Sequence, residues 1–517
     1  MNFPAMQKLA RGLAALLIAA ASGAIAQDRG GGEPKAATEP NPVPSIELNR
    51  IADKGALRLL PKDSVTRHRI ETASGPLAYT ATAGTLLLHD ASGERAAAVF
   101  YTAYAAEDRA AARRPVTFVF NGGPGAASAY LHLGLAGPRV ADFGPGQRDA
   151  AATRLHDNPD TWLQFTDLVM IDPVGSGFSR PARADGGREF WSVARDAEAI
   201  AKVIALWLAH NRRGASPKFI LGESYGGFRA AKVATALRKD HGLSVAGIIM
   251  VSPLMEGAFT FSGTRFALGA AMQIPSLAAA ELERKGLFTP ERLAEAERFA
   301  FNEYLTTLAG PPPRGEAART FYARVAEITG MPVDVVTRTR GFIRDAYVKH
   351  LRGAERLIVS RYDATFAGPD PYPEDPARRG PDPLLDGLSR AYGSLMSVYV
   401  REELGYRTDM TYVLLSGEAN GRWEWGRGGG RESASIDGDL RSLLTLDRSF
   451  RLLVAHGYTD MVTPYAVSRY VLDHLPDFPN PARAQLRVYR GGHMFYIDAG
   501  SRRAFTADAR SFYEAEP

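Results

Sequence analysis

The sequence contains no cysteine among its 517 residues. This absence excludes disulfide bonds, thiol catalysis and cysteine metal sites, so core burial alone must hold the fold together. The formal net charge of +5 is spread along the chain without a long block of Lys and Arg, which argues against a nucleic-acid partner. Beyond the N-terminus, no apolar run reaches the length of a membrane span.

The N-terminus has the pattern of a secretory signal peptide over residues 1–26. Two basic residues precede the apolar stretch 12–21, and Ala24-Ile25-Ala26 is a small-residue cleavage pattern. We expect cleavage before Gln27 and export to the periplasm or the medium; an uncleaved N-terminal anchor is the alternative. Residues 27–46 are rich in Gly, Pro, Glu and Ala, which indicates a flexible linker.

Two strand patterns follow the linker. Alternating residues from about 66 to 104, interrupted by a turn at 90–94, predict an antiparallel meander. From residue 116 onward, short apolar runs alternate with helical segments, which is typical of a mostly parallel, doubly wound sheet. The sequence therefore predicts an α/β fold with an antiparallel edge.

A long helical stretch punctuated by proline-rich segments interrupts the strand pattern. We expect a core built from 47–254 and 441–517, with a helical cap insertion over 255–440. Such an insertion would lie above the nucleophile and shape a pocket; an independent helical domain is the alternative. Trp423 and Trp425, near its end, either line that pocket or are simply packed.

Residues 222–227, Gly-Glu-Ser-Tyr-Gly-Gly, follow the apolar run Phe219-Ile220-Leu221 and precede a helical segment. In a G-x-S-x-G elbow the two glycines let strand and helix approach closely, so the serine sits in a strained turn with its hydroxyl clear of the sheet. Ser224 is therefore the candidate nucleophile. The alternative is an ordinary glycine-rich turn with a surface serine.

A serine nucleophile needs a histidine base and an acid that orients it, in the chain order Ser, Asp, His for this type of sheet. Asp460 comes just after the apolar strand 452–455, and His493 comes just after the alternating strand 485–489. Both therefore lie in loops at the carboxyl ends of strands, where catalytic groups gather. His456 is a rival base, but it precedes Asp460, and we interpret it as structural.

The loop Asn121-Gly122-Gly123-Pro124-Gly125 directly follows the strand 116–120. A tetrahedral oxyanion requires two backbone N–H donors, and a glycine-rich loop can bring its backbone close enough to supply one. The residue after the nucleophile supplies the other. We expect the N–H groups of Gly123 and Tyr225 to form the oxyanion hole; a plain Gly-Pro turn is the alternative.

Together these motifs resemble the serine carboxypeptidases, peptidase family S10, on the α/β-hydrolase fold. The resemblance implies a triad of Ser224, Asp460 and His493 in an exopeptidase that removes residues one at a time from the C-terminus of a peptide. The matching segments run in the family's order over most of the chain: 121–125 with Gly137-Pro138, Asn158-Pro159 with Trp162, 172–179, 222–227, the Asp460 loop and 492–494.

The resemblance also implies that Asn121 and Glu223 bind the terminal carboxylate of the substrate. Glu223 would have to be protonated, because a neutral acid donates a hydrogen bond whereas two ionised carboxylates repel. Peptide binding should then favour acidic pH; a buried packing role for Glu223 is the alternative. The chain departs from the family at Ala126, where eukaryotic members have cysteine, and at Leu135, where an ungapped count places a second family glutamate. Carboxylate recognition is then weaker or built differently.

Three other functions share part of this pattern. An esterase or lipase on the same fold would use the same triad, and an acyltransferase would pass the acyl group to a small alcohol. An exported binding protein that has lost catalysis is the third. The mechanism requires no metal or organic cofactor, and no His/Asp/Glu spacing demands one. Peptides are the expected partners, with no nucleic acid and no stable membrane span after signal cleavage, and the oligomeric state is not indicated.

Overall fold

The computed structural model describes residues 55–107, 113–144, 153–426, 429–478 and 480–515. The predicted signal peptide (1–26) and linker (27–46) lie outside these residues. These described residues belong to one compact unit. In the described ranges no helix combines the length and the apolar character needed to cross a membrane.

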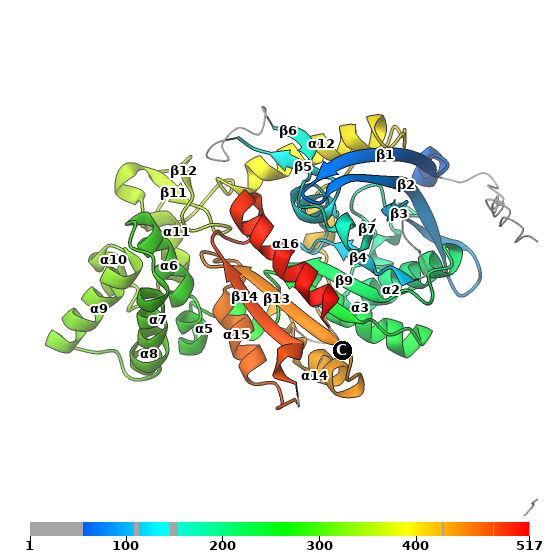
Figure 1. Ribbon diagram of the computed structural model, residues 1–517. Coiled ribbons are helices and arrows are strands. Elements are labelled where there is room, and N and C mark those ends of the chain that lie inside the picture. Colours follow the sequence, from blue (N-terminus) through cyan, green and yellow to red (C-terminus); the bar gives the residue numbers. More distant parts are fainter. Residues whose placement is uncertain (1–54, 108–112, 145–152, 427–428, 479, 516–517) are drawn as a thin grey trace, which may run out of the picture. The chain divides into compact units, whose positions relative to one another are not determined.

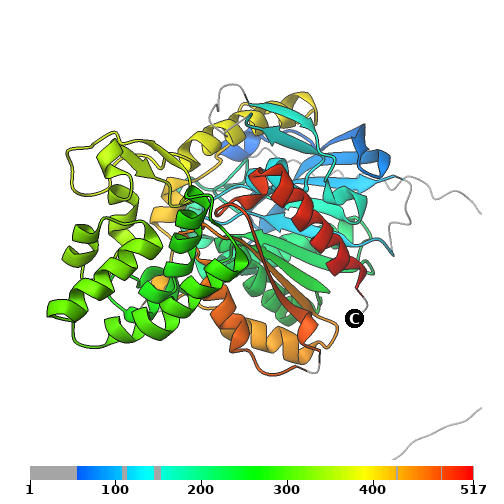
Figure 2. The ribbon, with the colours of Figure 1, turned by 60° about the vertical axis from the view of Figure 1, so that its left-hand side comes forward.

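A ten-stranded sheet forms the centre of this unit (Figures 1 and 2). Its strands are β1 (Ser64–Thr72), β2 (Gly75–His89), β3 (Arg95–Ala106), β4 (Val116–Phe120), β7 (Asp167–Ile171), β8 (Arg180–Pro181), β9 (Lys218–Glu223), β10 (Gly247–Val251), β13 (Arg451–Gly457) and β14 (Ala484–Tyr489). The order is β1-β2-β3-β7-β4-β9-β10-β13-β14, and β8 pairs with β3. All pairs from β1 to β7 are antiparallel and all pairs from β7 to β14 are parallel. The predicted meander and parallel sheet of an α/β-hydrolase fold are therefore confirmed.

Helices cover both faces of the sheet, which explains why the central strands are apolar throughout. In β10, Ile248 and Met250 belong to one hydrophobic cluster, whereas Ile249 and Val251 belong to the other. The first cluster includes side chains of α2 (Val193–His210), α3 (Tyr225–His241), α14 (Asp437–Leu446) and α15 (Tyr465–Asp473). The second includes side chains of α1 (Ala129–Leu131), α12 (Leu385–Glu402) and α16 (Ala499–Glu514).

The chain between β10 and β13 packs in two different ways. Its first half forms a separate hydrophobic cluster that includes Tyr304 and Tyr347, and in both views it lies beside the β14 edge of the sheet (Figures 1 and 2). The helices there are α4 (Gly257–Phe261), α5 (Ala267–Ala271), α6 (Ile274–Arg284), α7 (Pro290–Phe299), α8 (Leu305–Ala309), α9 (Gly315–Thr329), α10 (Val333–Arg338) and α11 (Arg344–His350). The second half returns to the main core, where Tyr392 and Tyr399 of α12 are buried. The predicted cap boundaries, 255–440, stay a prediction.

Two short antiparallel sheets were not expected from the sequence. β5 (Arg139–Asp142) pairs with β6 (Arg154–Asp157), and β11 (Leu357–Val359) pairs with β12 (Ala367–Pro369). Helix α13 (Gly417–Gly421) follows α12. Strands of three or four residues carry too little alternation to be distinguished from loops.

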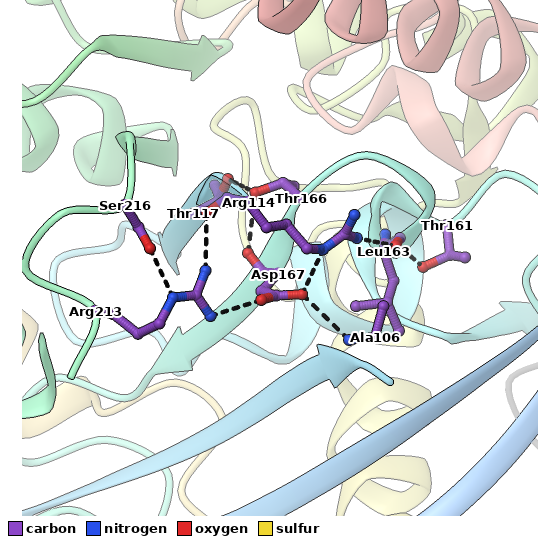
Figure 3. A network of polar contacts seen from close by, with 9 residues as sticks. All are labelled: Ala106, Arg114, Thr117, Thr161, Leu163, Thr166, Asp167, Arg213 and Ser216. Carbon is purple, nitrogen blue, oxygen red and sulfur yellow. Dashed lines mark hydrogen bonds and ion pairs between the residues drawn. The ribbon is translucent and has the colours of Figure 1, made fainter. Parts of the chain in front are cut away.

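Asp167, the first residue of β7, lies between two arginines (Figure 3). Arg114 Nε donates to Asp167 Oδ1 at 2.7 Å, and Arg213 Nη1 donates to Oδ2 at 2.6 Å. These three side chains are at most 6 % exposed. Arg213 also donates to Ser216 Oγ and to the Arg114 carbonyl. The network ties the starts of β4 and β7 to the segment before β9.

Replacing this carboxylate is expected to destabilise the fold strongly. Asp167→Ala leaves two buried guanidinium groups without their counter-charge, which typically costs about 3–5 kcal/mol. Urea unfolding followed by circular dichroism measures the loss. Glu327→Ala is the matched control, because its ion pair with Arg324 is exposed on α9 and should contribute less than about 1 kcal/mol. Equal losses in the two variants would contradict the structural role of Asp167.

Candidate active site

Ser224 stands in a sharp turn between β9 and α3. Its φ of 61° and ψ of −124° are backbone angles that residues with a side chain rarely adopt. A Cβ on Gly222 would lie 2.1 Å from the Gly226 carbonyl oxygen, and a Cβ on Gly226 would lie 2.7 Å from that of Phe120. Glycine is therefore required for strand, turn and helix to come so close. This is the geometry of a nucleophile elbow.

Asp460 and His493, in the loops after β13 and β14, are joined by a hydrogen bond. The imidazole Nδ1–H donates to Asp460 Oδ2 at 2.8 Å, and both side chains are at most 3 % exposed. The N–H groups of Val462 and Thr463 donate to Asp460 Oδ1, and the Thr463 hydroxyl donates to Oδ2. With its proton on Nδ1, the imidazole keeps Nε2 as the nitrogen that can accept a proton.

The protonation of His493 responds to two opposing influences. Burial disfavours the imidazolium, but the charge and hydrogen bond of Asp460, together with the charge of Glu223, outweigh it and raise the pKa of His493. A raised pKa makes the imidazole a stronger base once it is neutral.

The end of β10 ties the elbow to the His493 loop. The N–H of Ser224 donates to the Val251 carbonyl at 2.9 Å, and the hydroxyl of the next residue, Ser252, donates to the His493 carbonyl at 2.8 Å. Among the described residues no hydrogen bond joins Ser224 directly to the imidazole. Two consecutive residues at the end of β10 thus bind the backbones of the two candidates: Val251 binds Ser224, and Ser252 binds His493.

His456, the rival base, is part of the core. It is fully buried in β13, and its Nε2 lies 2.7 Å from Ser468 Oγ on α15. Burial lowers the pKa of His456 to about 4. The interpretation of this histidine as structural agrees with these contacts.

The 121–125 loop lies against the first residues of α3. A Cβ on Gly122 would lie 2.5 Å from Tyr225 N and 2.8 Å from Gly226 N. Gly123 has a φ of 98°, which favours glycine. The two predicted oxyanion donors therefore belong to adjoining backbone segments. The N-terminus of a helix also has unpaired N–H groups and a partial positive charge, both of which suit a developing oxyanion.

Asn121 is held in place by one hydrogen bond to its side chain and one to its backbone carbonyl. Its Oδ1 accepts the Leu131 N–H at 3.1 Å, which fixes the orientation of the amide. Its backbone carbonyl accepts a hydrogen bond from Arg229 of α3. Arg229 is itself paired with buried Asp196 of α2, with Nε and Oδ2 2.6 Å apart. The loop position is therefore coupled to the packing of α2 against α3.

Glu223 directly precedes Ser224 and receives two hydrogen bonds on one oxygen. Asn121 Nδ2 donates to Glu223 Oε2 at 2.6 Å, and the Tyr496 hydroxyl donates to the same atom at 2.7 Å. Burial raises the pKa of Glu223 to about 7, although the charge of His493 and these hydrogen bonds oppose the increase. Glu223 therefore changes protonation near neutral pH.

Three contributors to the site were missed in the sequence. The hydroxyl of Tyr496, in the 3-10 turn η11 (Phe495–Ile497), donates to Glu223. The hydroxyl of Thr463 donates to Asp460. Neither forms a recognisable motif, although Tyr496 comes only three residues after His493. The third is Tyr362, described below. Leu135 is fully buried in the hydrophobic core.

The chain between β10 and β13 touches the site at several places, among them the surroundings of His493 and of Tyr225. The Tyr362 carbonyl accepts the His493 N–H at 2.6 Å, and the Tyr362 ring packs edge-on against the imidazole. Trp423 and Trp425 pack edge-on around the Tyr225 ring, with ring centroids 5.2 and 5.5 Å apart. The two tryptophans therefore support the residue that follows Ser224.

Within the described part of the chain, no group of three or more His, Asp and Glu side chains is arranged to hold a metal ion.

Three comparisons place this chain among known proteins. The family model described as serine carboxypeptidase matches residues 75–260. The comparison with curated proteins finds no significant match. Similar solved structures include proline iminopeptidase from Mycobacterium smegmatis, with 16 % identity, 84 % of this chain and 97 % of that chain covered, and a TM-score of 0.37. A putative aryl esterase from Burkholderia cenocepacia has 14 % identity, 83 % and 98 % coverage and a TM-score of 0.36. Homoserine O-acetyltransferase from Bacillus anthracis has 12 % identity, 88 % and 99 % coverage and a TM-score of 0.36.

The matched residues include the 121–125 loop, β9, the elbow and α3, whereas Asp460 and His493 follow them in the chain. The resemblance to the serine carboxypeptidase family is thereby confirmed over residues 75–260, and the chain is a serine hydrolase with the α/β-hydrolase fold.

Proposed function

We propose that this protein is an exported serine carboxypeptidase that hydrolyses the C-terminal peptide bond of peptide substrates. The observation that carries the proposal is the buried pair of Asn121 and Glu223 next to the elbow, with the Glu223 pKa raised to about 7. A buried acid that is neutral at mildly acidic pH can donate to a substrate carboxylate. An enzyme that recognised only esters or internal peptide bonds would have no use for such a donor.

The mechanism is acyl transfer to Ser224. His493 Nε2 takes the hydroxyl proton as Ser224 Oγ attacks the scissile carbonyl, and it then protonates the leaving amino acid. Asp460 holds the imidazole in the required tautomer and stabilises the imidazolium. The N–H groups of Gly123 and Tyr225 stabilise the oxyanion. Water then attacks the acyl-enzyme by the same route, and the shortened peptide leaves.

Peptide binding should weaken as the pH rises through the pKa of Glu223. Below pH about 7 Glu223 is protonated and donates to the terminal carboxylate; above it, the two carboxylates repel. We expect the KM of an N-blocked dipeptide to rise about tenfold per pH unit on the alkaline side. On the acidic side kcat should fall, because protonated His493, whose pKa is raised, cannot act as a base.

Steady-state kinetics on the blocked dipeptide and on its C-terminal amide, at mildly acidic and mildly alkaline pH, test this proposal. The amide carries no carboxylate, so its KM should not rise with pH. Glu223→Gln is the control variant, because its neutral amide does not titrate and should remove the alkaline rise. Cleavage of a simple ester with neither peptide touched would overturn the carboxypeptidase assignment in favour of an esterase. Ester products formed with an added alcohol would indicate an acyltransferase.

A further inference from the structure

The hydrogen bonds on Glu223 distinguish its two oxygens. Oε2 accepts both the Asn121 amide and the Tyr496 hydroxyl. The Asn121 amide cannot reverse these roles, because its Oδ1 is engaged by the Leu131 N–H. Burial raises the pKa of Tyr496 well above its ordinary value, so this hydroxyl stays protonated and remains a donor.

This arrangement decides where a proton on Glu223 resides. A carboxyl oxygen that accepts two hydrogen bonds has both lone pairs occupied and behaves as the carbonyl oxygen of the neutral acid. The proton then lies on Oε1, which has no hydrogen-bond partner among the described residues. Oε1 is therefore the oxygen that can donate to a ligand.

Several titratable groups face Glu223 from different parts of the fold. Three of them act on the protonation of Glu223: Asp460 and His493, in the loops after β13 and β14, through their charges, and Tyr496 of η11 through its hydroxyl. In the other direction, the charge of Glu223 adds to burial in raising the pKa of three tyrosines on α1, α12 and the segment after β11: Tyr130, Tyr392 and Tyr362. Of these four tyrosines, Tyr496 alone donates a hydrogen bond to the Glu223 carboxyl group among the described residues. Tyr392 resembles Tyr496 in burial and position, since a Cβ on Gly134 would lie 2.6 Å from each of the two side chains. The Tyr392 hydroxyl, however, has no hydrogen-bond partner among the described residues.

We propose that Tyr496 is a positioning residue for substrate selection: its hydroxyl holds Glu223 Oε2 as an acceptor and so directs the Oε1 proton to the terminal carboxylate of the peptide. This inference rests on the proposed carboxypeptidase function. Tyr496 acts through Glu223 and does not touch the reacting atoms. Its removal should therefore alter peptide recognition more than the acyl-transfer chemistry.

The test compares Tyr496→Phe with the matched control Tyr392→Phe in the full mature protein. Each variant loses one buried tyrosine hydroxyl from the same cluster, but only the first loses a hydrogen bond to Glu223. The substrates are a blocked dipeptide, its C-terminal amide and a simple ester, each over a range of pH. Rates are normalised to the fraction of molecules that a fluorophosphonate labels, so partial misfolding does not imitate a kinetic effect.

We expect Tyr496→Phe to reduce the kcat/KM ratio of free acid to amide about five- to tenfold at mildly acidic pH, mainly through KM. Ester hydrolysis should change less than twofold. The alkaline rise in KM should move to higher pH, because the lost hydrogen bond lowered the pKa of Glu223. A purely structural role of the ring would not produce this shift, and Tyr392→Phe should match the unmodified protein.

Two results would overturn the inference, and they can be told apart. If the unmodified protein prefers the free acid and Tyr496→Phe behaves like Tyr392→Phe in selectivity and pH dependence, the role of Tyr496 is wrong while the proposed function stands. If the unmodified protein does not distinguish the free acid from the amide, both are wrong.

Discussion

Ser224→Ala is expected to lower kcat by roughly four to six orders of magnitude, because no other group in the elbow can form the acyl-enzyme. Substrate binding should persist, since Asn121 and Glu223 are unchanged. The fold should also persist: alanine tolerates the positive φ at this position about as poorly as serine does, so the substitution adds no new backbone strain.

The measurement is hydrolysis of the blocked dipeptide together with fluorophosphonate labelling, with thermal unfolding as a check on folding. Ser176→Ala is the matched control, because Ser176 is also buried in a loop and its hydroxyl bonds, among the described residues, only to the Pro173 carbonyl. That control should be labelled and should keep its activity. Turnover by a clean preparation of Ser224→Ala would show that Ser224 is not the nucleophile.

Asp460→Asn is expected to lower kcat by roughly three to four orders of magnitude. The new amide can keep the hydrogen bonds from Val462 and Thr463 on its Oδ1, but its NH₂ group would face His493 Nδ1. The imidazole would then accept at Nδ1 and carry its proton on Nε2. In that tautomer it cannot take the proton from Ser224.

Asp363→Asn is the matched control for this change. Asp363 is also close to the Asp460 loop, but its carboxylate accepts hydrogen bonds from Thr365 and Thr459 and none from the imidazole. Its kcat should remain within about tenfold of the original. The pH dependence of kcat separates the two roles further, because only Asp460 raises the pKa of His493 through a direct hydrogen bond. If both Asn variants lost activity equally, Asp460 would have no special role in the triad.

The features that were predicted correctly depend on short stretches of chain. The apolar runs at 219–221 and 452–455 form parallel strands, because strands buried on both faces need no polar alternation. The glycine spacing at 222–226 produces the elbow, because only glycine permits the close backbone contacts there. Local side-chain pattern and backbone sterics are sufficient for both.

Other features arise only when distant segments meet. The hydrogen bond between Tyr496 and Glu223 joins residues 273 positions apart, and no local pattern specifies it. The pKa of Glu223 depends on how deeply the finished fold buries it and on which donors reach its Oε2. The same holds for the chain between β10 and β13, whose periodicity shows helices but not that α12 packs into the main core.

The amino acids alone predicted the chain order of Ser224, Asp460 and His493, the strands before them and the elbow glycines, because each of these depends on local pattern. Tertiary structure alone decided the hydrogen-bond partners of Glu223, and with them which of its two oxygens carries the proton. It also decided the contacts of Tyr362 with the His493 loop. The physical reason is that hydrogen bonds and desolvation depend on distance in space, which a linear sequence does not specify.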